Sequence, residues 1–139
     1  MKFLIDTCVI SELAKAVPDR KVVFWATQND EENFYLSALT FGEIHKGICK
    51  LPPSKMKEDL HQWVEYELME RFKNRIIDID LRVAKTWGKI QGESEAKGRP
   101  LPAIDSLIAA TGIAHDLIVV TRNTADMEQS GVSLLNPWE

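Results

Sequence analysis

Short apolar runs alternate with longer segments of helical periodicity along this chain of 139 residues. The apolar runs are typical of buried strands, and the segments between them carry hydrophobic residues at three- and four-residue spacing. The expected strands lie at about 2–6, 34–38, 76–79, 117–121 and 132–135. This alternation predicts a central parallel sheet with helices on both faces and right-handed crossovers. We therefore expect an α/β fold with three layers, α/β/α, in a single domain over residues 1–139.

Several helix boundaries are also readable. A helix is expected to follow Asp19, and Asp80 can cap another that carries apolar residues on one face. Thr40 is expected to open a helix through Lys50, and Pro52-Pro53-Ser54 interrupts the chain before a long helix from about Lys55 to Phe72. The last two helices predict a helical hairpin.

Four acidic residues stand where a strand ends or a helix is expected to begin. Asp6 closes the apolar run Phe3-Leu4-Ile5, while Glu43, Asp105 and Asp126 each lie near an expected helix start. Because strand ends and the following helix starts share one edge of a parallel sheet, these acids are expected to converge on one crevice. Clustered carboxylates repel one another unless a divalent cation or shared protons accompany them. Since Mg²⁺ and Mn²⁺ favour carboxylate and water ligands, the pattern indicates a metal-dependent hydrolase acting on a phosphate ester.

Each acid also has a purely structural interpretation. Asp6 fits the N-cap of the helix that follows it, and Thr40-Phe41-Gly42-Glu43 fits a capping box. Asp105, three residues after Pro102, would oppose the positive end of its helix, and Asp126 can cap a short turn. Capping does not require the acids to meet, so their convergence is the feature that separates the two interpretations.

The segments around the acids resemble, in order, the motifs of the PIN-domain ribonucleases. They read FLIDTCVISEL, SALTFGEIHKG, PAIDSLIAATG and VVTRNTADMEQSGVSLLNPW. The resemblance runs from Met1 to about Trp138, and within that superfamily the chain looks like a VapC/FitB-type toxin of a toxin–antitoxin pair. It implies a PIN-like domain with a central parallel sheet, the fold that the alternation of strands and helices also predicts.

The resemblance implies an endoribonuclease that depends on Mg²⁺ or Mn²⁺. Asp6 and Asp105 would ligate the metal most directly, with Glu43 and Asp126 in the same site partly through water. Activated water would attack phosphorus in line and leave a 5′-phosphate and a 3′-hydroxyl. The preference for RNA comes from the resemblance, because this reaction does not use the 2′-hydroxyl. The resemblance further implies a cognate antitoxin that binds DNA through its own domain, so that this chain meets DNA only indirectly, and a homodimer.

Two other functions stay open at this point. A haloacid-dehalogenase-like phosphatase would also place an aspartate after its first strand, but Cys8 replaces its usual second aspartate, which disfavours this alternative. The other is a regulatory partner that assists an antitoxin in DNA binding with little nuclease turnover. A protein nucleophile is poorly supported, because Cys8 has no histidine partner in a recognised motif. His45, His61 and His115 show neither H-E-x-x-H spacing nor a triad arrangement.

Composition bounds these functions only loosely. The 17 basic and 21 acidic residues give a net charge of -4, so any nucleic-acid footprint must be local. Candidates for it are Lys46, Lys50, Lys55, Lys57, Arg71, Lys73 and Arg75. The two cysteines have no metal-ribbon or disulfide-framework spacing, which indicates a reduced cytoplasmic protein. No signal peptide or membrane-spanning apolar run is visible, so we expect no membrane association.

Overall fold

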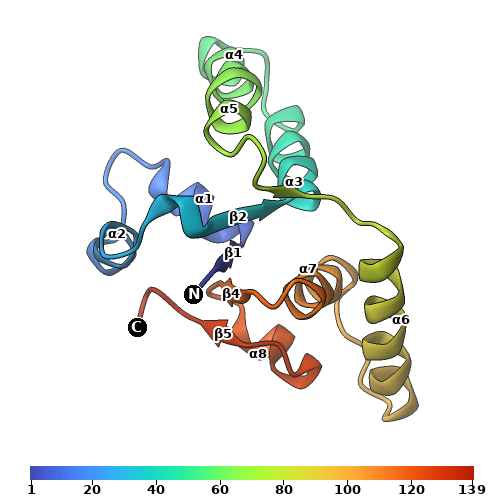
Figure 1. The fold of residues 1–139 in the computed structure, drawn as a ribbon. Coiled ribbons are helices and arrows are strands. Elements are labelled where there is room, and N and C mark those ends of the chain that lie inside the picture. The colour runs from blue at the N-terminus through green and yellow to red at the C-terminus, as the bar shows by residue number, and fades with distance from the viewer.

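A single five-stranded parallel sheet organises the computed structural model, which describes all 139 residues (Figure 1). The strands are β1 (Phe3–Ile5), β2 (Phe34–Ser37), β3 (Ile76–Ile77), β4 (Ile118–Val120) and β5 (Leu134–Leu135). Their order across the sheet is β3-β2-β1-β4-β5, and every neighbouring pair is parallel. The first strand of the chain therefore lies at the centre, between β2 and β4.

Helices cover both faces of this sheet. They are α1 (Thr7–Leu13), α2 (Arg20–Thr27), α3 (Ala38–Cys49), α4 (Lys55–Gln62), α5 (Met69–Arg71), α6 (Leu81–Ala96), α7 (Ala103–Ala114) and α8 (Thr124–Met127). A π-helical segment, η2 (Trp63–Leu68), joins α4 to α5, and short 3₁₀ turns lie at η1 (Glu31–Asn33) and η3 (Glu128–Ser130). α1 and α2 lie on one side of the sheet, and α7 and α6 lie on the other (Figure 1). The α/β/α architecture expected from the sequence is confirmed.

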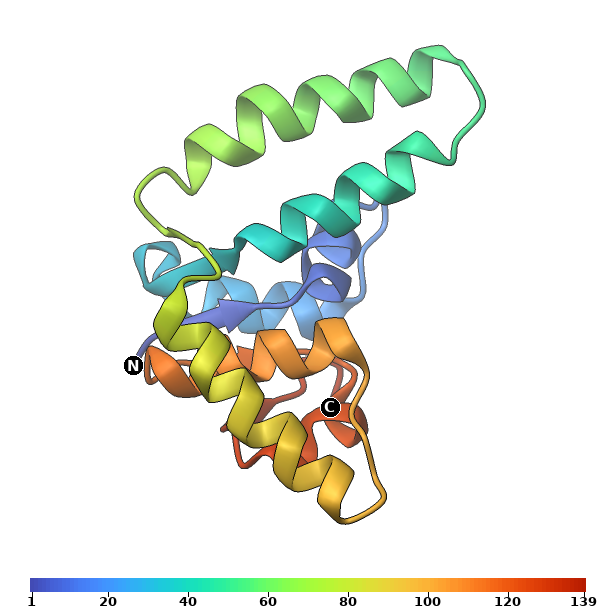
Figure 2. The same ribbon diagram turned by 90° about the vertical axis from the view of Figure 1, so that its right-hand side faces the viewer.

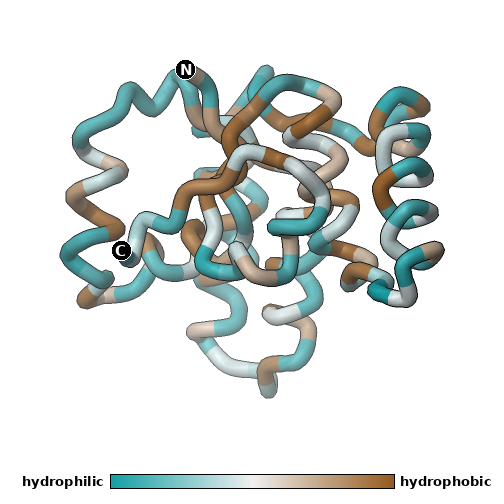
Figure 3. Tube along the Cα trace, turned by 90° about the horizontal axis from the view of Figure 1, so that it is seen from below, coloured by the Kyte–Doolittle hydropathy of each residue, from teal (hydrophilic) through white to brown (hydrophobic).

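The core follows the two-residue period of a strand. In β1, Phe3 and Ile5 pack in the cluster under α1 and α2, whereas Leu4 points to the opposite face and packs with Ile108 of α7. Figure 3 shows the hydrophobic stretches gathered in the middle of the molecule and hydrophilic stretches along much of the periphery. Because both faces of β1 are buried, its sequence reads as a continuous apolar run.

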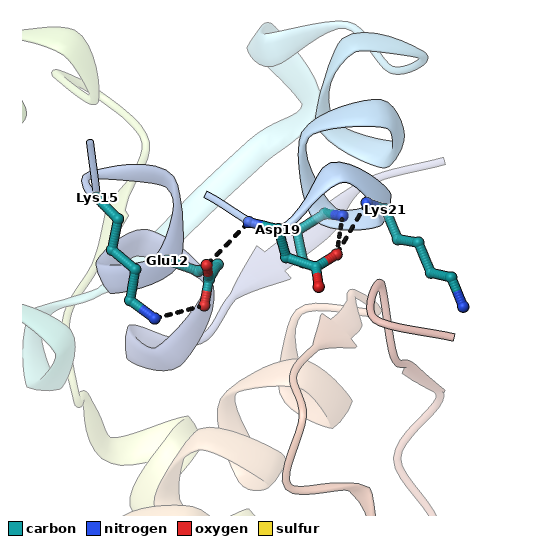
Figure 4. A network of polar contacts seen from close by, with 5 residues as sticks. Glu12, Lys15, Asp19 and Lys21 are labelled. Carbon is teal, nitrogen blue, oxygen red and sulfur yellow. Dashed lines mark hydrogen bonds and ion pairs between the residues drawn. The ribbon is translucent and has the colours of Figure 1, made fainter. Parts of the chain in front are cut away.

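A polar network fixes the connection from α1 to α2 (Figure 4). Glu12 accepts hydrogen bonds from Lys15 Nζ and from the backbone N–H of Asp19, both at 2.9 Å. The hydrogen bond from Lys15, followed by the one from Asp19, lowers the pKa of Glu12. Asp19 in turn accepts from the N–H of Lys21 at 2.8 Å and caps α2. The helix expected after Asp19 is therefore present and begins at Arg20.

The expected helical hairpin forms an arm of α3 and the α4–η2–α5 segment, which run side by side (Figure 2). Its base is tied to the sheet by Arg75, which donates to the carbonyl oxygens of Glu31 and Phe34. Near the tip, Lys57 Nζ donates to the carbonyl oxygens of Cys49 at 3.4 Å and Leu51 at 3.0 Å. None of the helices combines the length and apolar character needed to cross a membrane.

The start of α3 differs from the expectation. The helix begins at Ala38, and Ser37 is its N-cap, with the Ser37 hydroxyl accepting from the N–H of Leu39 at 3.1 Å. Thr40 therefore does not open the helix, and its buried hydroxyl has no hydrogen-bond partner. The physical reason is that β2 ends directly at a serine, a preferred N-cap residue, so the helix starts before Thr40.

Gly112 allows α7 to lie directly against the sheet. A Cβ at this position would come within 2.8 Å of Val119 Cγ2 and 2.9 Å of Val132 Cγ2. We expect Gly112→Ala to cost about 1–3 kcal/mol of stability, because an added methyl group forces α7 away from the sheet. The matched change Gly92→Ala, on the exposed side of α6 with nothing within 4 Å, should stabilise by about 0.5–1 kcal/mol. Denaturant unfolding of both variants measures this, and equal stability of Gly112→Ala and the parent would contradict the packing argument.

Candidate functional site

Asp6 is held in place by the pairing of the two central strands. Its backbone N–H donates to the carbonyl oxygen of Val120 at 3.0 Å, which extends the β1–β4 ladder and brings Asp6 beside Thr121. One carboxylate oxygen then accepts from the Thr121 hydroxyl at 2.7 Å, and the other accepts from the N–H of Thr7 at 2.8 Å. Asp6 is 4% exposed. It is both the N-cap of α1 and a buried carboxylate at the carboxyl edge of the sheet.

Glu43 reaches the same edge from α3. It lies in the second turn of that helix, five residues after Ala38, so the capping-box interpretation is wrong. Instead its Oε1 accepts a hydrogen bond from the Thr7 hydroxyl at 2.6 Å. Thr7 therefore links Asp6 to Glu43, through its backbone on one side and its side chain on the other.

Asp105 lies in the first turn of α7, as its spacing from Pro102 predicts. The start of α7 is anchored by α6: Trp87 Nε1 donates to the Ser106 hydroxyl at 3.0 Å. Gln91 also forms two hydrogen bonds with the backbone of Leu101, donating to its carbonyl oxygen at 2.8 Å and accepting from its N–H at 2.9 Å. The polar side chains of α6 thus fix the loop and helix turn that carry Asp105.

Asp126 is the most exposed of the four acids. It lies in the first turn of α8 but does not cap it, since Asn123 holds the N-cap position. The loop before α8 is fixed by Thr121, whose hydroxyl accepts from the N–H of Asn123 at 3.0 Å while donating to Asp6. The segment that carries Asp126 is therefore connected to the buried carboxylate through one hydroxyl.

The four carboxylates interact electrostatically. Burial, followed by the negative charges of Asp6, Asp126 and Glu43 in that order, raises the pKa of Asp105 from 3.8 to about 6. The convergence expected from the sheet topology is therefore present. No ion pair involves any of these acids, so their repulsion has no counter-charge within the protein.

The donor set fits a hard divalent cation. Every candidate ligand is an oxygen, from the four carboxylates and from the nearby threonine hydroxyls, and Mg²⁺ and Mn²⁺ favour such ligands. No three of the carboxylates bring oxygens within 4.8 Å of one another.

Two residues next to the acid cluster, Cys8 and Arg122, make contacts that give them structural roles. Burial raises the pKa of the Cys8 thiol, which disfavours the nucleophilic thiolate, and its sulfur accepts from the N–H of Arg122 at 3.5 Å. The guanidinium of Arg122 stacks over the ring of Trp138, 4.2 Å from its centroid. The guanidinium of Arg122 is therefore engaged with Trp138 and not with the acid cluster.

Thr7 is the contributor that the sequence did not reveal. The Asp-Thr pair after an apolar run signals only a helix start, and nothing local shows that the hydroxyl reaches α3. Thr121 is the last residue of the strand expected at 117–121. The structure adds its partners, Asp6 and the N–H of Asn123.

Known proteins resemble this chain over almost its whole length. The family model described as PIN domain matches residues 3–129. The chain is 35% identical over 136 residues to the VapC ribonuclease Y4jK of Sinorhizobium fredii, covering 98% of this chain and 97% of that protein. It is 36% identical over 135 residues to toxin FitB of Neisseria gonorrhoeae, covering 97% of both. The solved structure of FitAB bound to an IR36 DNA fragment matches with a TM-score of 0.92 and 35% identity, over 99% of this chain and 96% of that one.

The raised pKa of Asp105, caused first by burial and then by the neighbouring acids, predicts a pH-dependent effect of Asp105→Asn. Because the folded protein holds the Asp105 proton more tightly than the unfolded chain, ionisation of this group lowers stability as pH rises from about 4 to about 6. Asp105→Asn removes that cost, so it should stabilise the metal-free protein above pH 6 and have little effect at pH 4. Allowing for solvent screening, the gain should be on the order of 1 kcal/mol, or about 3–5 °C.

Thermal melts in chelator across this pH range measure the difference between variant and parent. Asp116→Asn is a matched control, because Asp116 is exposed, lies just beyond the opposite end of α7 and has a positive φ that asparagine tolerates. A stabilisation by Asp105→Asn that does not change with pH would contradict the electrostatic explanation.

Proposed function

Because this chain belongs to the PIN-domain family, we propose that it is a metal-dependent endoribonuclease and the toxin of a toxin–antitoxin pair. The observation that carries the proposal is the convergence of four carboxylates at one sheet edge, in a chain that aligns over 98% of its length with a ribonuclease. The family match leaves the dehalogenase-like phosphatase alternative without support. The whole chain, residues 1–139, is proposed to act as one nuclease domain.

We assign the roles of the acids as the membership in the PIN-domain family implies. Asp6, which is buried at the end of β1, and Asp105, in the first turn of α7, are the proposed direct ligands. Glu43 and the exposed Asp126 are proposed to act partly through water. Thr121 and Thr7 are positioning residues, because each donates a hydrogen bond that orients one of these carboxylates.

A bound Mg²⁺ or Mn²⁺ supplies activation of water and neutralises charge on the phosphodiester. The protein contributes the fixed carboxylates that hold the ion and the hydroxyls that orient them. Their repulsion when no ion is present favours uptake of a cation. No protein nucleophile is needed, in agreement with the raised pKa of Cys8.

The proposed RNA footprint is smaller than the sequence suggested. Lys57, Arg71 and Arg75 are engaged in hydrogen bonds with backbone carbonyls or with Glu31. The lysines left for phosphate contacts near the arm are Lys46, Lys50, Lys55 and Lys73. Since phosphate binding by a few lysines is strongly salt-dependent, we expect RNA affinity to fall steeply with ionic strength.

An apolar groove of about 480 Å³ is the surface that we assign to the antitoxin. It lies between α1 and α2 on one side and the η2–α5 part of the arm on the other. Its lining includes Leu13, Val23 and Ala26 from the first pair of helices and Trp63, Leu68 and Phe72 from the arm. The related FitB is a toxin whose FitAB structure contains DNA, which supports a partner that brings this chain to DNA. Homodimerisation stays a prediction.

The first prediction of this proposal concerns cleavage. The purified protein should cleave single-stranded RNA only with Mg²⁺ or Mn²⁺, and Asp6→Asn or Asp105→Asn should lower the rate by about 10²-fold or more, because each removes a ligand. Glu43→Gln should weaken Mn²⁺-induced thermal stabilisation, since it reduces charge in the cluster. Asp116→Asn should keep full activity. Activity in chelator, or in both aspartate variants, would remove the metal-hydrolase hypothesis. Metal binding without cleavage across varied RNAs would favour the regulatory alternative.

The second prediction separates catalysis from partner binding in cells. Expression of this chain alone should arrest growth, and a short protein encoded beside it should restore growth. Asp105→Asn should be tolerated while still binding that partner.

The groove is tested by a second variant. Ala26→Arg places a long charged side chain in the groove, so this variant should remain toxic but lose at least about tenfold in partner affinity. Gln28→Arg lies outside this groove on the same helix end and should behave like the parent. Rescue of Ala26→Arg at normal affinity would exclude this groove.

A further inference from the structure

The arm brings two of the three histidines together. His45 of α3 faces the segment that carries His61, at the end of α4, and Glu65, in the π-helical segment η2. One ligand atom from each of these residues lies within 4.8 Å of the other two. The trio is the one group of three potential metal ligands in the protein that meets this distance. It is separate from the acid cluster, although His45 and Glu43 lie on the same helix.

Within the trio, His45 contacts both of the other residues. His45 Nε2 and Glu65 Oε1 are 3.0 Å apart, and the rings of His45 and His61 meet edge to face with centroids 5.9 Å apart. His61 and Glu65 are four residues apart, which places both on the same side of the helix. The side chains of His45 and Glu65 are 40% and 36% exposed, so an ion can reach them from solvent.

The donor atoms of the trio favour a different kind of cation from the one that the acid cluster favours. Two imidazole nitrogens and one carboxylate form a ligand set that zinc uses widely, whereas Mg²⁺ and Mn²⁺ favour oxygen alone. Tetrahedral bonds of about 2.0–2.1 Å place ligand atoms roughly 3.4 Å apart. The His45–Glu65 pair already lies near that separation, so rotation of exposed side chains is enough to complete the set.

We propose that His45, His61 and Glu65 bind a single Zn²⁺ ion that clamps α3 to the α4–η2 segment. Such an ion would join two helices that the chain connects only through the loop at the tip of the arm. The π-helical segment supports this assignment, since single π turns within helices are frequent at functional sites.

One member of the trio, His61, borders open space at the surface. An open hollow of about 580 Å³ between α3 and α4 is lined by Ile48 of α3 and by Lys57, Glu58, His61 and Gln62 of α4. Three protein ligands with one position left for water is a common zinc arrangement. The ion would therefore hold the arm together and keep one coordination position facing solvent.

The test is zinc binding by the untagged full-length protein, measured by titration calorimetry with Mg²⁺ in excess to occupy the acid cluster. We expect a single Zn²⁺ per chain with a dissociation constant on the order of 1 µM, weaker than four-ligand structural sites. His45→Gln, His61→Gln and Glu65→Gln should each weaken binding by about tenfold or more. His115→Gln and Glu67→Gln change the same residue types outside the trio and should bind like the parent.

Two further measurements separate this site from the proposed nuclease centre. Asp105→Asn should bind Zn²⁺ like the parent, whatever its effect on RNA cleavage. Zinc should slow backbone hydrogen exchange in residues 54–68 of the parent, and His61→Gln should abolish that protection. Unchanged zinc affinity in the three trio variants, equal loss in His115→Gln, or loss confined to Asp105→Asn would each overturn the proposal.

Discussion

The parallel pairing of β1 with β4 is the contact on which the rest of the structure depends. It aligns the ends of two strands that are more than a hundred residues apart in sequence, so that Asp6 meets Thr121. From that point Thr7 begins α1 and reaches Glu43 of the arm. On the opposite face, Gly112 lets α7 approach β4 closely enough to bring Asp105 to the same edge. Four segments thus converge because one strand pair sets their common edge.

This arrangement opposes stability locally. Four negative charges share an edge without a cationic neighbour, and the raised pKa of Asp105 reflects the cost of its burial together with that repulsion. The apolar clusters on the two faces of the sheet offset it, since β1 and its neighbours are almost completely buried. The hydroxyls of Thr7 and Thr121 reduce the cost further by donating hydrogen bonds to carboxylates that would otherwise lose their water partners.

Local sequence pattern was enough for most of the fold. Hydrophobic periodicity located the strands and helices, because burial on a strand or a helix face imposes its own spacing. The convergence of the acids also followed from the sequence, since parallel topology places strand ends together. The start of α3 could not be predicted in this way, because Ser37 and Thr40 are both good N-cap residues. Only the position where β2 ends decides between them.

Contacts between side chains that are distant in the sequence could not be predicted, for a different reason. The Thr7–Glu43 hydrogen bond and the His45–His61–Glu65 trio depend on how two helices pack, and packing leaves no periodic signal in the sequence. The histidines looked dispersed along the chain, yet the return of the arm places two of them in contact. The π-helical segment was equally hidden inside a pattern that reads as one long helix.

The stacking of Arg122 on Trp138 gives the end of the chain an electrostatic role. Arg122 follows Thr121 directly, at the rim of the acid cluster, and is a natural candidate for an internal counterion. Trp138 holds its guanidinium over an indole ring, and its positive charge acts on Glu12 instead of Asp105. No cationic side chain of the protein pairs with the acid cluster, so the positive charge that neutralises it has to come from outside the chain.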